Sequence, residues 1–341
     1  MQQNSVSPSY VAAELQARKD RSNHDFSKAA SSAKDAAEIA RLDGDLASWW
    51  NMTFFQAENL LDAEDFDECA ELAADLVNGP RATTACHDKA RTYILLAMAR
   101  QGAGLLEQAA DAARAAVDLV SDESDVETNV KARQALIAAL ADIGRLDEAW
   151  TECLALADVI SAEVDDQLVG KAYWVIGNVA FLCNKVQEGL DYHELAAATF
   201  SPARNLDIWA KFNKASAAMR LAADVADADT LRCIERAELA TDVIGGSAND
   251  FLLMRLNRGH WNYLAGDFEA AIEILEGVCA EADNTSPQIL GEACLLLGRA
   301  HEAIGDHPAS REHLLKAAGY FEASGAQQRA DQARDFLAAE S

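Results

Sequence analysis

Three histidines near the carboxyl end of the chain are the residues whose type and spacing come closest to a chemical motif. His301, His307 and His313 are six residues apart in the segment HEAIGDHPASREH. Two histidines on one helix bind zinc together when they are four residues apart, because both rings then leave the same face. A spacing of six with a turn between the residues does not meet this condition. We therefore expect a packed or surface role for His301, and no metal or other cofactor.

Other patterns that mark active sites do not occur in the sequence. It has no P-loop, no GxSxG or HExxH motif and no dinucleotide-binding glycine fingerprint. Acidic pairs such as Asp165–Asp166 occur, but a chain with 56 Asp and Glu residues produces such pairs by chance. We expect a protein that is not an enzyme.

The charge of the chain excludes several classes of partner. Lys and Arg number 29 and Asp and Glu number 56, which gives a formal net charge of −27 over 341 residues. Such an acidic surface repels phosphate backbones and anionic membrane surfaces. We therefore expect neither nucleic acid nor membrane as a partner. Half of the residues are hydrophobic, which supplies material for a large core or an elongated array.

The cysteines and the first residues bear on the cellular compartment. The seven cysteines are Cys69, Cys86, Cys153, Cys183, Cys233, Cys279 and Cys294. They are odd in number and scattered, which is typical of free thiols in a reducing cytoplasm. The start MQQNSVSPSY resembles no secretory signal, and no apolar run approaches the ~20 residues that span a bilayer. We expect a cytoplasmic protein.

A recurring phrase indicates which elements position the polar side chains. Residues 266–272 read GDFEAAI, and similar phrases begin at His24, Glu64, Gly104, Gly144, Asn184 and Gly305. The sixth place of each phrase is small: Ala29, Cys69, Ala109, Ala149, Gly189, Ala271 and Ser310. A less regular unit between Gly189 and Ala271 supplies Cys233 in the same role. The first four intervals are 40 residues each, so the sequence predicts about eight repeated units.

Each unit is predicted to be two helices joined by a short turn. Within residues 170–200, Tyr173, Ile176, Gly177 and Ala180 have the spacing i, i+3, i+4, i+7 of one helix face. A second small position precedes each turn: Ala17, Ala57, Ala97, Gly177, Ser216, Gly259 and Gly298, with Ile137 as the exception. A small residue on both helices lets their axes approach to about 8–10 Å. We therefore expect the two small positions to meet at the helix contact.

In these features the sequence resembles the tetratricopeptide-repeat (TPR) family. The resemblance lies in the GDFEAAIEIL stretch and in LLLGRAHEAIGDHPASREHLLKAA at 295–318, and it spans residues 9–323. The units are about 40 residues long in place of 34, and so are similar to those of bacterial peptide-pheromone receptors and of some eukaryotic adaptor proteins. The resemblance implies an all-α, right-handed superhelical solenoid of about eight hairpins. We interpret residues 1–8 as a flexible N-terminus and 324–341 as a C-terminal capping helix.

In the family that the sequence resembles, the first helix of each hairpin lines a concave groove. This register implies a set of groove residues: Arg18, Phe54, Glu58, Arg91, Met98, Lys131, Gln134, Trp174, Asn178, Asn213, Arg220, Asn257, His260 and Arg299. The longer turn of the sixth unit leaves the register of Asn213 and Arg220 open. Phe54 and Trp174 could anchor a ligand or belong to the core, and for Phe54 we favour the core.

The set has two properties that suit a peptide ligand. Asn178, Asn213 and Asn257 could each hold an extended backbone through the side-chain amide. Several cations lie on this face of an acidic protein, which suits a peptide carboxylate or an acidic segment. The alternative is that these charges are merely solvated. Asn178 also matches the family's carboxylate clamp, but the lysines expected with it are absent, so we do not predict chaperone-tail binding.

Two kinds of function agree with all of these features. The first is a cytoplasmic scaffold or adaptor that binds a protein or peptide in the groove. The second is a receptor that senses a peptide effector; since only eight residues precede the first expected helix, it would lack its own DNA-binding domain and act through protein contacts. The sequence leaves open the oligomeric state, and whether the groove or the convex face is the main binding surface.

Overall fold

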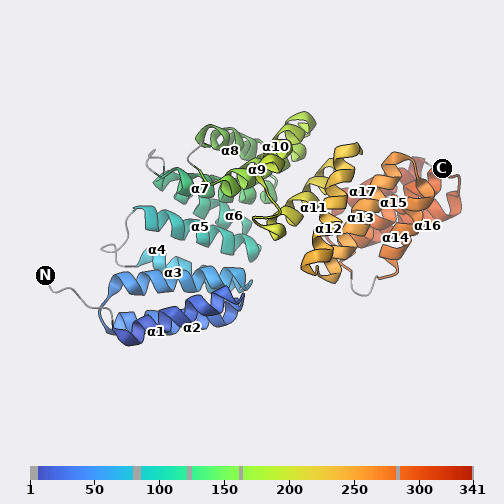
Figure 1. Ribbon diagram of the computed structural model, residues 1–341. Coiled ribbons are helices and arrows are strands. Elements are labelled where there is room, and N and C mark those ends of the chain that lie inside the picture. The colour runs from blue at the N-terminus through green and yellow to red at the C-terminus, as the bar shows by residue number, and fades with distance from the viewer. Residues whose placement is uncertain (1–6, 80–85, 121–124, 161–163, 282–284, 340–341) are drawn as a thin grey trace. The chain divides into compact units, whose positions relative to one another are not determined.

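The computed structural model describes residues 7–79, 86–120, 125–160, 164–281 and 285–339. Within these ranges the regular structure is α-helical and no strand occurs. Figure 1 shows the helices in chain order. The chain divides into two units, residues 1–183 and residues 184–341. Each unit has hydrophobic clusters of its own.

The helix bounds follow the predicted units. Unit 1 contains α1 (Pro8–Ser22), α2 (Phe26–Leu42), α3 (Leu46–Asp62), α4 (Phe66–Asn78), α5 (Cys86–Gly102), α6 (Leu106–Leu119), α7 (Val126–Ile143), α8 (Leu146–Val159) and α9 (Asp166–Leu182). Unit 2 contains α10 (Val186–Thr199), α11 (Leu206–Ala222), α12 (Ala228–Ile244), α13 (Ala248–Ala265), α14 (Phe268–Cys279), α15 (Pro287–Ala303), α16 (His307–Ala323) and α17 (Gln327–Ala339). The all-α fold of TPR-like hairpins is confirmed. The two helices of the predicted fifth hairpin, α9 and α10, belong to different units, so the count of eight hairpins and the hand of the superhelix stay predictions.

The first residue of the repeated phrase is where the chain turns. Gly104, Gly144, Gly266 and Gly305 have φ between 76° and 85°, the left-handed region that favours glycine. The next residue donates its backbone N–H to the carbonyl five residues back, as Asp267 does to Asn262 at 2.9 Å. This hydrogen bond ends the first helix.

The aspartate of the Gly-Asp pair begins the second helix. Asp267 is the N-cap of α14, and its side chain accepts a hydrogen bond from the N–H of Ala270. Asp306 does the same for α16 through the N–H of Ala309. Capping by Asp satisfies a backbone donor that the helix itself leaves without a partner. The two residues of the pair therefore specify the end of one helix and the start of the next.

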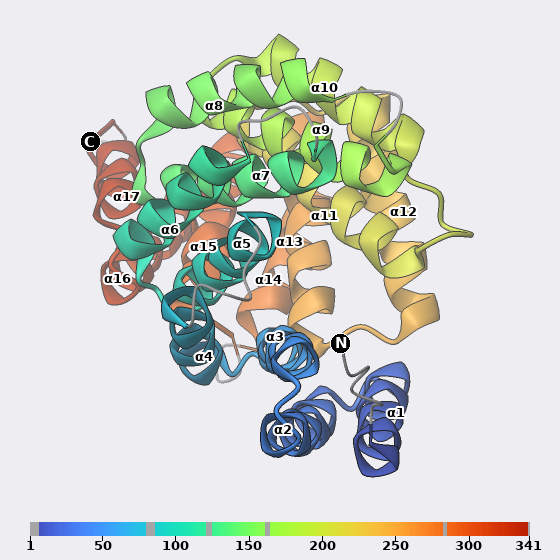
Figure 2. The ribbon, with the colours of Figure 1, turned by 90° about the vertical axis from the view of Figure 1, so that its left-hand side faces the viewer.

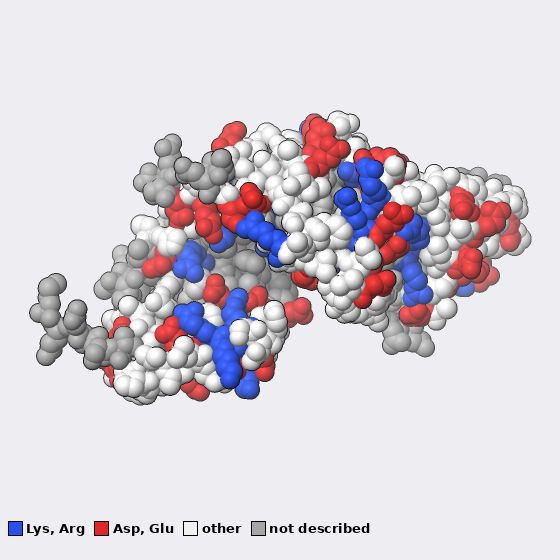
Figure 3. All heavy atoms as spheres, in the orientation of Figure 1, with Lys and Arg blue, Asp and Glu red and all other residues white. Residues whose placement is uncertain are grey.

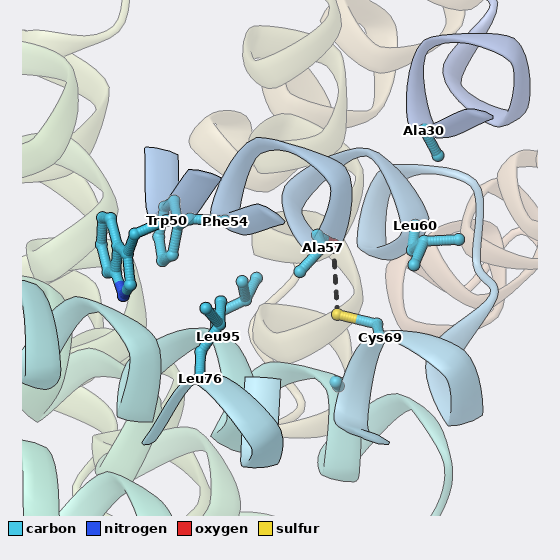
Figure 4. Packing of buried hydrophobic residues seen from close by; sticks show 9 residues of the cluster. Ala30, Trp50, Phe54, Ala57, Leu60, Cys69, Leu76 and Leu95 are labelled. Atoms are coloured by element: carbon cyan, nitrogen blue, oxygen red, sulfur yellow. Dashed lines mark hydrogen bonds between the residues drawn. The ribbon is translucent and has the colours of Figure 1, made fainter. Parts of the chain in front are cut away.

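The small residues of the repeat lie at the contact between the helices of a hairpin. Cys69 on α4 and Ala57 on α3 are both fully buried, and the Cys69 Sγ lies 3.2 Å from the Ala57 carbonyl oxygen (Figure 4). A Cβ added to Gly298 on α15 would meet Leu314 Cγ at 2.6 Å and the Ser310 carbonyl oxygen at 3.2 Å. The predicted close approach is therefore present, and it explains the small positions.

The first helices of successive hairpins form a layer within each unit. In unit 1, α3 packs on α5, α5 on α7 and α7 on α9; in unit 2, α11 packs on α13 and α13 on α15. Figure 2 shows α3, α5 and α7 following one another across unit 1. Side chains that leave the outer face of these helices are thus collected from residues about 40 positions apart.

The last described helix packs against the helix before it. α17 packs against α16, and its Ala330 and Ala333 are fully buried in a cluster with Leu314 and Phe321. This packing is compatible with the capping role that the sequence predicts for 324–341.

Candidate functional site

A pocket of about 490 Å³ lies on the first-helix layer of unit 1. It is lined by side chains from α1, α3, α5 and α7. Five of the expected groove residues contribute to it: Phe54, Glu58, Arg91, Met98 and Lys131. Figure 3 shows Lys, Arg, Asp and Glu side chains gathered over unit 1. The structure therefore brings together residues that are 77 positions apart in sequence, from 54 to 131.

Glu58 is a half-buried carboxylate that lines the pocket. Burial raises the pKa of the Glu58 carboxyl group, and the positive charges of Arg21, Arg91 and Lys131 oppose this shift. Burial prevails, because the carboxylate loses hydration that three cations at a distance do not replace. The pocket therefore combines cations with an acid that is more readily protonated than usual.

Arg91 differs from the other two cations in its partners. Arg21 forms an ion pair with Asp62 at 2.8 Å, and Lys131 forms one with Glu127 at 2.6 Å. The Arg91 guanidinium lies over the Phe54 ring, 4.5 Å from its centroid, and makes no hydrogen bond or ion pair with any residue that the structure describes. A half-buried guanidinium in this state has N–H groups available for an anionic ligand.

The apolar part of the pocket comes mainly from α5. Met98 is 44% exposed and stands beside Ile94 and Leu95, which are buried. Phe54 is also buried, and its ring stacks on Trp50 with the centroids 5.2 Å apart (Figure 4). Phe54 thus belongs mainly to the core and presents one face to Arg91.

The remaining expected residues of unit 1 lie outside the pocket. Arg18 is exposed and bonds to Glu14 on its own helix, with its guanidinium 5.3 Å from the centroid of the Phe55 ring. The Gln134 amide donates to the Leu168 carbonyl at 3.4 Å, which joins α7 to α9. Trp174 and Asn178 are half-buried on α9.

Three expected residues of unit 2 are engaged between helices. The Asn257 amide donates to the Lys214 carbonyl at 3.3 Å. The pKa of His260 is lowered to about 4, mainly by burial; the negative charge of Asp224 opposes this shift, and the positive charges of Arg299 and Arg329 add to it. The Arg299 guanidinium lies between the rings of Tyr263 and Phe336, 4.8 Å and 5.0 Å from their centroids.

The sixth unit has a register different from the one we expected. Asn213 and Arg220 are 1% and 4% exposed, and the Asn213 amide donates to the Trp209 carbonyl of its own helix. The turn after α11 is at Asp224, whose φ is 57°. Counted back from the turn, Ala218 takes the place that Met98 has before Gly104, and Ala218 is exposed. Asn213 and Arg220 therefore do not lie on the exposed face of α11. Aspartate adopts the left-handed conformation more readily than most residues do, so Asp224 was the sequence signal that could have set this register.

The three histidines do not converge on a common point. His301 is buried and its ring stacks on that of His313, with the centroids 5.3 Å apart and the planes 4° from parallel. His307 is exposed and its Nδ1 lies 2.8 Å from Glu302. Among the described residues, no group of three or more His, Cys, Asp or Glu side chains is arranged to hold a metal ion.

None of the described helices is both long enough and apolar enough to cross a bilayer.

No protein-family model and no curated protein matches the chain, whereas several solved structures do. The apo form of the quorum sensor NprR from B. thuringiensis has a TM-score of 0.65 at 11% identity, over 92% of this chain and 87% of that one. The apo form of RapI has a TM-score of 0.59 at 11% identity, over 90% and 98%. A Rap protein complexed with Competence and Sporulation Factor has a TM-score of 0.57 at 11% identity, over 94% and 100%.

The chain has a TPR-like fold. At such low identity the likeness concerns the fold alone.

Proposed function

We propose that this chain is a peptide- or protein-binding module whose ligand occupies the pocket on the first-helix layer of unit 1. The observation that carries the proposal is the Arg91 guanidinium, which faces the pocket without a hydrogen-bonding partner among the described residues. A charged donor that folding leaves half-buried and unpaired costs free energy, and an anionic ligand offsets this cost.

The lining indicates the chemistry of the ligand. Three cations and four carboxylates line the pocket, whereas the whole chain carries 29 cations and 56 carboxylates. The pocket is thus less acidic than the chain as a whole, and a peptide carboxylate or acidic side chain is attracted to Arg91 and Lys131. Met98 and Ile94 offer an apolar surface for an adjoining hydrophobic side chain. We propose a segment with a carboxylate next to an apolar residue.

In this proposal the protein is a cytoplasmic adaptor that performs no covalent chemistry. The second candidate, a peptide-effector receptor, is favoured by two of the similar structures, which are a quorum sensor and a Rap protein complexed with Competence and Sporulation Factor. A receptor would use the same pocket and pass the signal on through protein contacts.

A library of short peptides with free carboxyl ends tests the proposal, with affinities of selected peptides measured by titration. We expect Arg91→Ala to weaken binding by about tenfold or more, since a half-buried charge-assisted hydrogen bond is lost. Arg114→Ala is the matched control, because Arg114 is also half-buried but lies on the second helix α6, outside the pocket. Equal affinities of the parent and Arg91→Ala would exclude the pocket as the binding site.

Small-angle scattering of the full chain separates the two candidate functions. A decrease in the radius of gyration when a selected peptide is added supports the receptor, because an effector must favour one of two conformations. An unchanged radius with the peptide bound supports the adaptor.

A further inference from the structure

Two cysteines in unit 2 lie in contact across neighbouring hairpins. Cys279 is the last residue of α14, and Cys294 lies in the middle of α15. Their Sγ atoms are 3.7 Å apart, and both are thiols in this structure. The sulfur atoms of a disulfide are about 2.05 Å apart, so a bond requires them to approach by about 1.7 Å. The pair is 15 residues apart in sequence and is brought together by the packing of α14 on α15.

The two thiols have different surroundings. Cys294 is 2% exposed in the cluster that contains Leu314 and Phe321. Cys279 is only half-buried, so a small oxidant reaches it first. The hydrogen bond from Cys294 and the positive charge of Lys316 lower the pKa of Cys279, against its burial and the nearby Glu276. The same hydrogen bond and burial raise the pKa of Cys294. Cys279 is therefore the nucleophile of the pair, and Cys294 the resolving thiol.

We propose that Cys279 and Cys294 form a reversible disulfide, which makes the contact between α14 and α15 a site of oxidative modification. This site is separate from the pocket of unit 1 and does not depend on the function proposed for that pocket. Its co-reactant is a peroxide or a small disulfide such as oxidised glutathione.

With hydrogen peroxide the reaction takes two steps. The Cys279 thiolate attacks one peroxide oxygen, the O–O bond breaks, and hydroxide leaves and takes up a proton to become water; Cys279 is now a sulfenic acid. The Cys294 sulfur then attacks the Cys279 sulfur, the S–O bond breaks, and a second water leaves with the Cys294 proton. Two thiols are oxidised to one disulfide, and one peroxide is reduced to two waters.

The bond would tie the last hairpin to the one before it. Cys279 packs against two hydrophobic clusters, one shared by α13, α14 and α15 and the other by α15, α16 and α17. A covalent link at this point limits the separation of these helices in partly unfolded states. The oxidised protein should consequently be more resistant to heat than the reduced protein.

The test uses the full chain with Cys86→Ser as the common background, because Cys86 is exposed and could link two molecules. The reduced protein is treated with an equimolar amount of hydrogen peroxide and digested after glutamate without reductant. Cleavage at Glu281 and Glu292 separates the two cysteines. We expect the fragments that contain Cys279 and Cys294 to remain linked, and to separate when reductant is added.

Two variants identify the roles of the thiols. In Cys294→Ser we expect a sulfenic acid on Cys279, trapped by dimedone, and no linked fragments. In Cys279→Ser we expect neither product, because the remaining thiol is buried. Cys233→Ser is the control for replacement of a buried cysteine, and it should form the Cys279–Cys294 link as the parent does. Circular dichroism verifies that each variant is helical, and alanine replaces serine at a position where serine prevents folding.

Thermal unfolding provides a second measurement on the same samples. We expect peroxide to raise the midpoint of the parent by about 5 °C, and reductant to reverse the rise. The two variants should show no rise. The proposal is wrong if the Cys279 and Cys294 fragments remain unlinked after treatment with peroxide and with excess oxidised glutathione, or if the only disulfide formed joins two molecules.

Discussion

At the scale of single residues, the turns between helices depend on one residue with a positive φ. Seven described turns have glycine at positive φ, but four others have His24, Glu64, Asn184 and Asp224, with φ between 57° and 63°. A residue with a Cβ costs about 1 kcal/mol or more in this conformation. These four turns therefore form at the expense of local strain, which the packing of the helices offsets.

Replacing one of these residues by glycine should stabilise the protein. We expect Glu64→Gly to raise the free energy of unfolding by about 0.5–1 kcal/mol, because the strain disappears and only part of the gain is lost to the greater freedom of the unfolded chain. Glu71→Gly, at an exposed position inside α4, should instead lower it by about 1 kcal/mol. Chemical denaturation of the two variants and the parent measures both changes. A destabilised Glu64→Gly protein would show that the Glu64 side chain contributes a contact of its own.

His260 permits a prediction about pH at the same scale. Burial is the main reason that its pKa falls from 6.5 to about 4 in the folded protein. The stability that comes from keeping this ring neutral is fully present above pH 6.5, and it is lost as the pH falls towards 4, because the unfolded chain then binds the proton first.

The variant His260→Gln should therefore lose less stability in acid than the parent. The thermal midpoints of both proteins are measured at about pH 7 and about pH 4.5. We expect the midpoint of the variant to fall less between these pH values than the midpoint of the parent. Parallel changes in the two proteins would mean that His260 is protonated in the folded state at the same pH as in the unfolded chain.

At the scale of helices, close packing within a hairpin depends on the small positions. Gly298 on α15 faces Leu314 on α16, and Gly259 on α13 faces Leu275 on α14, which a Cβ would meet at 2.7 Å. The exception is Ile137 on α7, which is fully buried, as is Ala149, the small residue of α8. The large Ile137 side chain is fully buried at this position. A small residue is therefore common at this place in the repeat but is not required there.

Two glycines of the last hairpin form a matched pair for testing this packing. Gly298→Ala should destabilise the protein by about 1–3 kcal/mol, because the added methyl group overlaps Leu314, despite the better helix propensity of alanine. Gly319→Ala, on the exposed side of α16 with no atom within 4 Å of the added Cβ, should stabilise it by roughly 0.5–1 kcal/mol. Urea unfolding measures both, and the same sign for the two variants would contradict the close-contact explanation.

At the scale of the whole molecule, each repeat buries its core against its neighbours, so an open end must be covered. α17 buries Ala330 and Ala333 against α16, while the opposite side of this helix carries charged residues such as Arg334 and Asp335 that are exposed. This amphipathic arrangement is the one expected of a capping helix.

Detaching α17 should lower the stability of unit 2. We expect Ala330→Asp to lower stability by roughly 2–4 kcal/mol and to increase aggregation, since a buried carboxylate without a partner expels the helix and exposes Phe321. Ala338→Asp, at an exposed position of the same helix, should change stability by less than about 0.5 kcal/mol. Thermal unfolding with light scattering measures both quantities. If Ala330→Asp had the same thermal midpoint as the parent protein, α17 would not act as a capping helix.

The sequence alone determined the helices, the turns and the contact positions. These features are local: a Gly-Asp pair ends one helix and begins the next, and small residues placed before and after the turn meet within the same hairpin. The register implied by the resemblance to the TPR family also placed Glu58, Arg91, Met98 and Lys131 on a common side of the first helices, and these four residues line one pocket.

The tertiary structure alone decided which of these side chains have partners. Asp62 and Glu127 pair with Arg21 and Lys131, whereas Arg91 has no ion pair among the described residues. Cys279 touches Cys294 because α14 packs on α15. Asn213 and Arg220 are buried because the longer turn of their unit changed the register. Repetition in a sequence fixes which face of its own helix a residue occupies, but contacts between helices depend on distances in space that local spacing does not contain.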